Sequence, residues 1–477
     1  MPMFINIHKH HRINLRILAF FMILLSIAII YHHVQIKKEK EKLVDLPKIK
    51  AKGELRALTL YSPTSYFIYR DKEMGYEYEI CAQLAKSLGL KLKMIIAPNE
   101  KTMLEMLQRN EGDLVAYNIP TTMEDKHEFI FCGRKYLTHQ VLIQQKKKSS
   151  KMISNVTQLI GKNVEVQKNS NYYSRLVHLN NEVGGGIHIK TIEANRISTE
   201  ELIDKVALGK IDYTIADNNI AQYDKTFYRN INISLAVSFN QNSFWVVRKT
   251  SPKLAAAINN WFSKNINSSA YQSITERYFE LNKNLVVGNP GIRKDGKISP
   301  YDALFKKQAV KIGWDWRLLA SIACQESDFN PNANNWTGAS GLMQIMPRTA
   351  RLLKINTDSL YDAETSIKGA VRLLKIYEKG LSFIKNKEQR QKMTIAAYNC
   401  GFGHIEDARA LAAKHKGNPD RWDGDNVEKY INLKSRPEFY DDPVCKQGYL
   451  RGSETTDFVR AVWTRYKYWT KKIPVRH

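Results

Sequence analysis

The 477-residue sequence is poor in cysteine, proline, glycine and acidic residues, and each shortage excludes a class of protein. Five cysteines, with no C-x-x-C pair, are too few for a disulfide scaffold and form no zinc motif. The odd count leaves at least one thiol unpaired within the chain. With only 14 Pro and 24 Gly beside 43% hydrophobic residues, the composition excludes a collagenous or mainly disordered chain. The length predicts two or three domains.

Acidic residues are outnumbered by basic ones, 47 against 73, which gives a formal net charge of +26. Such a field attracts a polyanion, whether nucleic acid, an anionic membrane surface or an acidic wall polymer. The sequence contains no zinc finger, RNP-like segment or basic helix of the usual nucleic-acid-binding kinds. We therefore expect no nucleic-acid partner.

One long apolar run is present, over residues 17–31, and Lys9, Arg12 and Arg16 precede it. A basic start followed by such a run is typical of a secretory signal, and the run is short for a spanning helix. Because no small-residue cleavage site follows, a retained signal is favoured over a cleaved one. Residues 1–50 are predicted to form this membrane anchor and a charged tether.

Residues 51–282 alternate strand-like and helical patterns. Candidate strands lie at 54–61, 91–97, 113–119, 163–167, 187–193, 212–217 and 243–249. Strands separated by helices predict parallel βαβ units and an α/β domain. Residues 104–119 and 202–217 share one pattern, a helix that ends near Gly and an Asp that opens an apolar strand. This repeat indicates two similar lobes.

The segments at 75–95, 112–131, 209–217 and 268–279 resemble, in order, the solute-binding proteins of family 3. The resemblance implies a two-lobed, periplasmic-binding-protein-like α/β fold that closes on a muropeptide, an amino acid or a similar polar solute. Asp125 stands where the family places a carboxylate-binding Arg, which leaves Lys126 and Arg134 as candidate substitutes. Asp217 keeps an acidic position that meets a ligand amine in the family, although an acid there also suits a turn at the strand end.

Residues 283–299 have the Gly, Asn, Pro and charge content of a linker. After them, residues 300–477 lose the strand pattern and read as helices. In the stretch 315–327, Leu318 and Ile322 form an apolar stripe that Glu326 extends. Burial at the end of such a stripe raises the pKa of a carboxyl group, as a general acid requires near neutral pH. A solvent-exposed Glu at a frayed helix end is the alternative.

This glutamate opens the first of four motifs: Glu326-Ser327, then TGASGLMQIMP at 337–347, AYN at 397–399 and GSET at 452–455. Together they resemble the lysozyme-like lytic transglycosylases. The resemblance implies a mainly α domain that cleaves the MurNAc-GlcNAc β-1,4 bond of murein and closes a 1,6-anhydro ring. Glu326 would serve as acid and then as base, and no cofactor or metal is implied.

The same resemblance implies the supporting residues. Gly341 and Gln344 would shape sugar subsites, Tyr398 and Asn399 would orient Glu326, and Ser327, Met343 and Glu454 would contact substrate. The alternative for each of them is a purely structural role in a turn, in a helix cap or in the hydrophobic core. His404 is expected to be a solvated loop histidine.

The predicted partners are therefore murein glycan strands, a membrane through the N-terminal segment, and a solute in the lobes. The family resemblance places the protein at the periplasmic face of the outer membrane, whereas an uncleaved apolar run favours the inner membrane. A hydrolytic muramidase and a non-catalytic envelope sensor remain as alternative functions.

Overall fold

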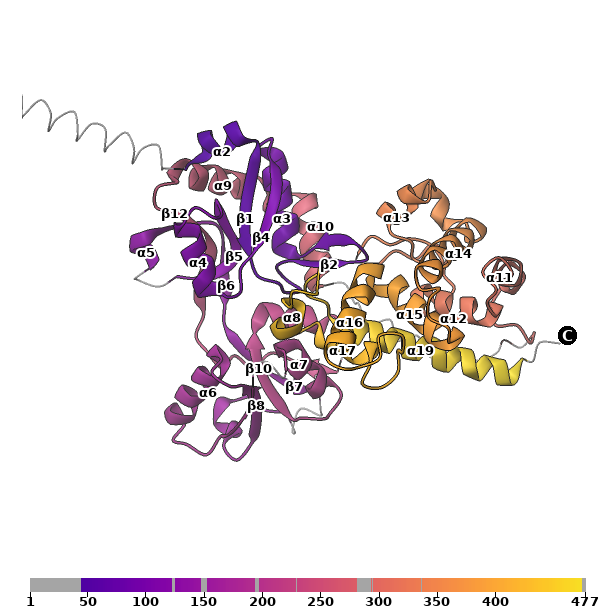
Figure 1. Ribbon diagram of the computed structural model, residues 1–477. Helices are drawn as coiled ribbons and strands as arrows, with labels where there is room; N and C mark the ends of the chain where they lie inside the picture. Colours follow the sequence, from indigo (N-terminus) through magenta and orange to yellow (C-terminus); the bar gives the residue numbers. More distant parts are fainter. Residues whose placement is uncertain are drawn as a thin grey trace, which may run out of the picture.

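The computed structural model describes residues 44–121, 125–146, 152–193, 197–228, 230–280, 293, 295–335 and 337–473. The apolar run at 17–31 and most of the linker at 283–299 lie outside these residues. None of the described helices combines the length and the apolar character needed to cross a membrane. Two α/β lobes lie one above the other in Figure 1, and a helical domain packs beside both.

The first lobe is built on a five-stranded sheet with the order β4-β1-β5-β12-β6. Its strands are β1 (Glu54–Thr59), β4 (Lys91–Ile96), β5 (Leu114–Pro120), β6 (Phe129–Thr138) and β12 (Gln241–Arg248), and its helices are α2 (Leu46–Lys52), α3 (Tyr76–Ser87), α4 (Glu100–Gln108), α5 (Asp125–Glu128), α9 (Pro252–Asn265) and α10 (Ser269–Phe279). Apolar clusters form on both faces of this sheet, which explains the continuous apolar runs of its strands.

The second lobe has a sheet of order β11-β7-β10-β8-β9. It contains β7 (Gln140–Gln145), η2 (Val156–Leu159), β8 (Asn163–Gln167), α6 (Asn171–Glu182), β9 (His188–Ile192), α7 (Thr199–Ala207), β10 (Tyr213–Asp217), α8 (Asn218–Lys225) and β11 (Ile231–Asn232). The lobes are joined twice, at His139 between β6 and β7, and between β11 and β12.

The sheets are mixed, so the prediction of parallel units holds only in part. In the first lobe β1 runs parallel to β4 and β5, whereas β12 runs antiparallel to β5 and β6. The chain leaves this lobe along β6 and returns along β12, so the two neighbouring strands run in opposite directions. Strand periodicity does not reveal such a crossing between lobes.

The predicted tether folds where it reaches the first lobe. Residues 46–52 form α2, and Ile49 is buried in the core of the lobe. The Asp45 side chain accepts hydrogen bonds from the backbone of Lys253 and Leu254, at 3.1 and 2.9 Å. The folded lobe therefore begins before residue 51.

The helical domain encloses one apolar core. Its helices are α11 (Asp302–Ala309), α12 (Trp316–Ser327), α13 (Pro347–Leu352), η4 (Thr357–Tyr361), α14 (Ala363–Gly380), α15 (Lys387–Cys400), α16 (Phe402–Lys414), α17 (Val427–Leu433), α18 (Pro437–Tyr440) and α19 (Gly452–Lys472). Leu318, Leu319 and Ile322 of α12 are fully buried, and burial stabilises each by roughly 1.5–3 kcal/mol. All five cysteines of the chain are free.

A short hairpin leaves the first lobe and reaches the helical domain (Figure 1). It consists of β2 (Phe67–Tyr69) and β3 (Lys72–Met74), joined by Arg70 and Asp71. Both turn residues have positive φ, 48° and 57°, as a type I′ hairpin turn requires. Asn and Gly are the residues that suit such a turn, so an Arg-Asp pair there indicates local strain tied to another role.

Candidate active site

Glu326 lies on the last turn of α12, where the helix core meets the hairpin. Glu326 is only 4% exposed, and the helix ends immediately after Ser327, at Asp328 in a left-handed conformation. Burial raises the pKa of Glu326, and the positive charge of Arg70 opposes part of that rise. The predicted buried stripe therefore places the carboxyl group inside the domain and not at a frayed, solvated helix end.

The guanidinium of Arg70 fills the space in front of this carboxylate. Its Nη2 donates to Glu326 Oε1 at 2.8 Å, its Nη1 to the Gln344 carbonyl at 2.9 Å, and its Nε to the Asn399 carbonyl at 2.9 Å. The Arg70 backbone N–H also donates to the Cys400 carbonyl at 3.0 Å. A residue of the first lobe thus binds the candidate acid and the backbone of the two segments beside it, at Gln344 and at residues 399–400.

Other hairpin contacts fix this insertion. The His404 ring lies 3.0 Å from the Ile68 carbonyl, Arg348 donates to the Asp71 carbonyl, and Lys72 donates to the Thr337 carbonyl at 3.4 Å. His404 is 1% exposed within α16, so the expectation of a solvated loop histidine is wrong. The hairpin of the first lobe covers the His404 ring, and the sequence around His404 does not predict this contact between domains.

The loop at 341–344 forms one wall of the site. Gly341 has φ 81°, and a Cβ atom there would lie 1.9 Å from the Leu360 carbonyl oxygen, so backbone packing demands the glycine. Gln344 donates through Nε2 to the Ala333 and Gly341 carbonyls, at 2.9 and 2.8 Å. The side chain of Met343 is fully buried in the domain core. Gln344 therefore shapes the wall, while Met343 packs beneath it.

The opposite wall comes from the end of α15. The Tyr398 hydroxyl donates to the Met343 carbonyl at 2.7 Å, and its ring lies 5.8 Å from the Arg70 guanidinium carbon. Asn399 accepts through Oδ1 from Thr455 at 2.8 Å. Ser327 donates to the Leu342 carbonyl at 2.7 Å. In this structure these side chains brace the two walls around Glu326.

Glu454 lies at the edge of the site, on the first turn of α19. Its Oε1 is 3.6 Å from Arg451 Nε, and it lines a small hollow with Phe67 and Tyr69 of the hairpin. Burial raises the pKa of Tyr69, the charge of Arg70 opposes that rise, and the charges of Glu454 and Glu326 add to it. Glu454 therefore borders the same hairpin that covers Glu326.

The second lobe docks on the helical domain through a separate ionic cluster. Arg451, 7% exposed, pairs with Asp204 at 2.7 Å and with Asp224. Arg436 pairs with Glu201 at 3.0 Å. Both lobes therefore hold the helical domain, one through Arg70 and the other through Arg451 and Arg436.

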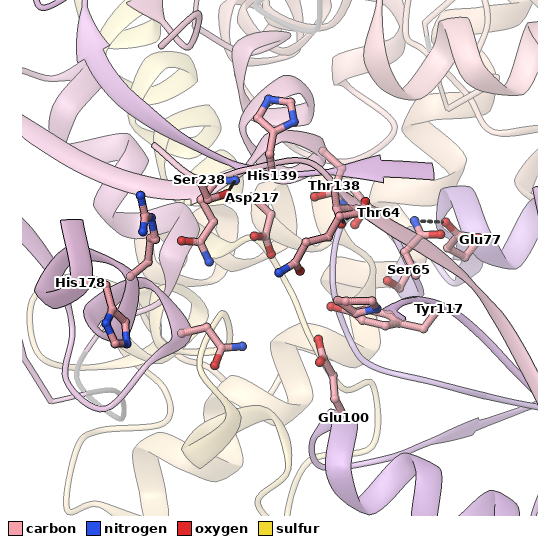
Figure 2. Close-up of a pocket in the computed structure, with 17 residues that line it drawn as sticks. Thr64, Ser65, Glu77, Glu100, Tyr117, Thr138, His139, His178, Asp217 and Ser238 are labelled. Atoms are coloured by element: carbon pink, nitrogen blue, oxygen red, sulfur yellow. Dashed lines mark hydrogen bonds between the residues drawn. The ribbon is translucent and has the colours of Figure 1, made fainter. Parts of the chain in front are cut away.

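A second cavity, of about 410 Å³, lies between the lobes. Of the three residues predicted to meet a lobe ligand, only Asp217 lines this cavity (Figure 2). Arg134 instead donates to the Tyr271 hydroxyl at 3.1 Å, and Lys126 is exposed on α5. The structure therefore does not bring Lys126 and Arg134 to the cleft, because β6 and α5 carry them to other faces of the first lobe.

Sequence reasoning missed Arg70 and the docking arginines, because their partners are far away along the chain. Arg70 and Glu326 are 256 residues apart. The one local sign is the Arg-Asp pair after the apolar residues 66–69, because hairpin turn preferences do not favour this pair. Among the described residues no group of three or more His, Cys, Asp or Glu side chains is placed to hold a metal ion.

Comparisons with known proteins match both parts of the chain. Residues 57–281 match the family described as bacterial extracellular solute-binding proteins, family 3, and residues 303–420 match the transglycosylase SLT domain. The membrane-bound lytic murein transglycosylase F of Desulfosudis oleivorans is 30% identical over 431 residues, which cover 90% of this chain and 92% of that protein. That of Pseudomonas putida is 29% identical over 434 residues, covering 89% and 87%.

A solved structure also aligns with about half of the chain. The L-cystine solute receptor of Neisseria gonorrhoeae, in its unliganded open conformation, is 17% identical with a TM-score of 0.40. The alignment covers 50% of this chain and 97% of the receptor.

Proposed function

The chain belongs to the family of membrane-bound lytic murein transglycosylases F, and from that premise we propose a reaction for its helical domain and a regulatory role for its lobes. The reaction is cleavage of the MurNAc-GlcNAc β-1,4 bond of murein with formation of a 1,6-anhydro ring. The observation that carries it is Glu326, a buried carboxyl group with a raised pKa at the centre of the SLT-like domain.

Glu326 supplies both proton transfers of this reaction. Its protonated carboxyl gives a proton to the glycosidic oxygen as the bond from that oxygen to C1 of the muramyl sugar breaks. The resulting carboxylate takes the proton of the 6-hydroxyl of the same sugar while O6 forms a bond to C1. No water is consumed, and the intramolecular attacker has a high effective concentration. The acetamido group of the muramyl sugar, or the field of the site, stabilises the developing positive charge.

The surrounding residues act through position. Tyr398 and Asn399 hold the two walls on either side of Glu326. Gln344 Oε1 is buried and has no hydrogen-bond partner among the described residues, which suits an acceptor for a substrate acetamido N–H. Gly341, Met343 and Ser327 keep the loop in place beneath the sugars, and Glu454 borders the substrate path at the hairpin.

Product analysis of murein digested by the full-length protein in detergent tests the reaction. We expect mass spectrometry to find muropeptides that end in 1,6-anhydro-MurNAc. Products that end in reducing MurNAc would identify a hydrolytic muramidase instead. Glycan that is bound but not cleaved would identify an envelope sensor.

The lobes regulate this reaction by covering the site. Arg70 stands where a glycan must reach Glu326, and its charge favours the ionised carboxylate, whereas the first proton transfer needs the neutral acid. The docked arrangement is therefore an inactive one. Murein cleavage requires withdrawal of the β2–β3 hairpin.

Arg70→Asn separates regulation from substrate positioning. Asn suits the positive φ of residue 70 but cannot reach Glu326, so the turn is kept and the contact is lost. A charge-assisted hydrogen bond contributes about 1.5–3 kcal/mol, so we expect murein cleavage to rise about 10-fold or more. Arg70→Lys should give an intermediate rise, and Arg109→Asn, at an exposed position of the same lobe, should give none. Reduced cleavage by Arg70→Asn would identify a positioning role.

Residues 1–50 attach this enzyme to a membrane of the cell envelope, with the domains on the periplasmic side. Separation of inner and outer membranes on a density gradient, followed by immunodetection of the full-length chain, tests the attachment. A protein found only in the soluble periplasmic fraction would contradict it.

A further inference from the structure

The outward face of α14 carries a stripe of basic side chains. The stripe recurs every three or four residues, so its members lie along one side of the helix, and all are exposed: Lys368, Arg372, Lys375 and Lys379. Like charges at this spacing destabilise a helix. The folding of α14 therefore does not account for the stripe, which points to a partner of opposite charge.

Helix α11 and the segment after it run beside α14 and extend this basic surface. Lys307 of α11 donates at 3.4 Å to Glu364, near the beginning of α14. Trp314, which follows α11, donates at 2.8 Å to Glu378, near the end of α14. The two segments therefore run in the same direction, and Lys307 and Lys311 are exposed along them. Figure 1 shows α11 at the side of the helical domain far from both lobes.

Acidic residues neutralise only one end of this surface. Glu364 forms ion pairs with Lys307 at 3.4 Å and with Lys368 at 3.0 Å. Glu378, nearer the other end, pairs with Arg390 at 3.3 Å. Among the described residues, no carboxylate forms an ion pair with any of the three later basic residues of the stripe. Three positive charges of α14 are thus available to an anionic partner.

Two exposed aliphatic residues lie among these charges. Val310, at the end of α11, is 81% exposed, and Ile376, one turn after Arg372 on α14, is 56% exposed. A single exposed aliphatic side chain is common on a soluble protein. Aliphatic side chains within a basic helical face are instead typical of a surface that lies on a membrane. There the charges meet lipid headgroups and the aliphatic groups enter the acyl boundary.

We propose that these exposed residues of α11 and α14, the α11–α14 face, bind the surface of an anionic lipid bilayer. Murein is also acidic, but a hydrated glycan offers no apolar layer to Val310 and Ile376, so the combination favours lipid. The contact is a second membrane-binding surface, separate from the proposed attachment through residues 1–50. It holds the helical domain itself at the membrane, by the side that lies far from the lobes (Figure 1).

A polarity-sensitive fluorophore on Val310→Cys tests the contact in the full-length protein. The chain is reconstituted into vesicles of phosphatidylcholine alone, or of equal parts of phosphatidylcholine and phosphatidylglycerol. We expect the emission to rise and shift to the blue in the anionic vesicles only, and to return as added salt screens the charges. Residues 1–50 attach the chain to both kinds of vesicle, so the difference between them reports the α11–α14 face.

Two labelled controls accompany this measurement. The same fluorophore on Leu208→Cys, an exposed position of the second lobe, should not respond to the lipid composition. The parent chain, labelled in parallel, gives the background from its five free cysteines. Equal emission from residue 310 in both kinds of vesicle would overturn the proposal. A rise only when purified murein is added would assign the face to the wall polymer and would also overturn it.

Removal of charge from the stripe locates the contact. Each basic residue near an anionic membrane strengthens binding about 5-fold. The combination of Arg372→Gln, Lys375→Gln and Lys379→Gln should therefore weaken the contact about 100-fold and remove the rise in emission. Circular dichroism should show the same helical content as the parent, because these exposed side chains lie outside the core.

The matched control removes the same net charge from another part of the chain. Lys162→Gln, Lys190→Gln and Lys210→Gln, at three exposed lysines of the second lobe, should leave the rise in emission unchanged when combined. A rise that survives the loss of the three stripe charges, or that both combinations abolish equally, would overturn the assignment of the contact to the α11–α14 face.

Discussion

The catalytic site and the cleft between the lobes both contain carboxyl groups with raised pKa values, but different groups face them. Glu326 faces an arginine supplied by another domain, whereas Glu100 and Asp217 face each other across a cavity of about 410 Å³. Desolvation raises the pKa of the carboxyl group in both places. The difference lies in the source of the counter-charge. Arg70 supplies it at the catalytic site, whereas Asp217 in the cleft is met by the neutral Tyr172 hydroxyl, 3.2 Å away.

The largest expected effect tests the chemical side of this comparison. Glu326→Gln keeps the shape of the acid but cannot exchange its proton, so we expect murein cleavage to fall about 10²–10⁴-fold. Release of soluble muropeptides measures it. Glu406→Gln, on the exposed face of α16, serves as the matched control and should cleave at the parental rate. Undiminished cleavage by the Glu326 variant would contradict the proposed acid.

The next prediction concerns the ion pairs of Arg451, which hold the second lobe against the helical domain. Arg451→Met leaves Asp204 and Asp224 buried and unpaired, a loss that costs about 3–5 kcal/mol when one partner of a buried ion pair is removed. We expect the second lobe to undock, which limited proteolysis and small-angle scattering would detect. Combining Asp204→Asn and Asp224→Asn with Arg451→Met should restore part of the docking, because no unpaired charge then remains. Equal proteolysis of parent and Arg451→Met would show that this cluster does not hold the lobe.

A smaller effect is expected from the wall of the catalytic site at Gly341, where the backbone is closely packed. Gly341→Ala places a methyl group against the Leu360 carbonyl at positive φ, and such backbone strain costs about 1–3 kcal/mol. Gly338→Ala has the same sign of φ but open space around the new atom, so only about 1 kcal/mol is expected. Urea unfolding of the two variants compares them. A Gly338 variant as destabilised as the Gly341 variant would contradict the packing explanation.

The sequence revealed Glu326 and missed Arg70 for one physical reason. Glu326 continues a helical stripe, so its burial follows from Leu318 and Ile322 a few residues away. The contact of Arg70 forms only when the hairpin packs on a domain whose Glu326 lies 256 residues later in the chain. Its positive φ is uncommon for arginine, so turn preferences did not predict the hairpin. Motif membership likewise identified the wall of the site but not the direction of each side chain. Met343 lies in the core, and residue 341 must be glycine because the Leu360 carbonyl packs against it.

The alternation of strands and helices predicted an α/β domain, and the internal repeat predicted its two lobes. The helical stretches after residue 300 correspond to helices of the structure. What could not be predicted is the contact between these parts. The docking residues are charged side chains, and charged side chains are mostly exposed to solvent in folded proteins. Contacts between domains depend on the complementarity of two surfaces, and neither surface alone carries a periodic pattern.

The smallest expected effect is a pH dependence at the edge of the covered site. Because the Ile68 carbonyl can only accept, His404 must donate to it through Nε2, which leaves Nδ1 unprotonated, buried and without a partner among the described residues. Burial and the nearby charge of Lys434 lower the pKa of His404 well below its ordinary value. The unfolded chain therefore takes up a proton first as the pH falls. The contribution of neutral His404 is complete above pH ~6.5 and is lost below it, by about 1.4 kcal/mol per pH unit.

His404→Gln keeps an N–H donor near the Ile68 carbonyl and removes the titration. Urea unfolding of the full-length protein at pH 7.5 and 5.5 should show a loss of stability in the parent that exceeds the loss in this variant by about 1.4 kcal/mol. The other titrating groups cancel in that difference. His415→Gln, at a histidine of the same domain whose ring stacks on Tyr430, is the matched control and should follow the parent. Equal losses in parent and His404→Gln would mean that the hairpin does not hold this ring neutral.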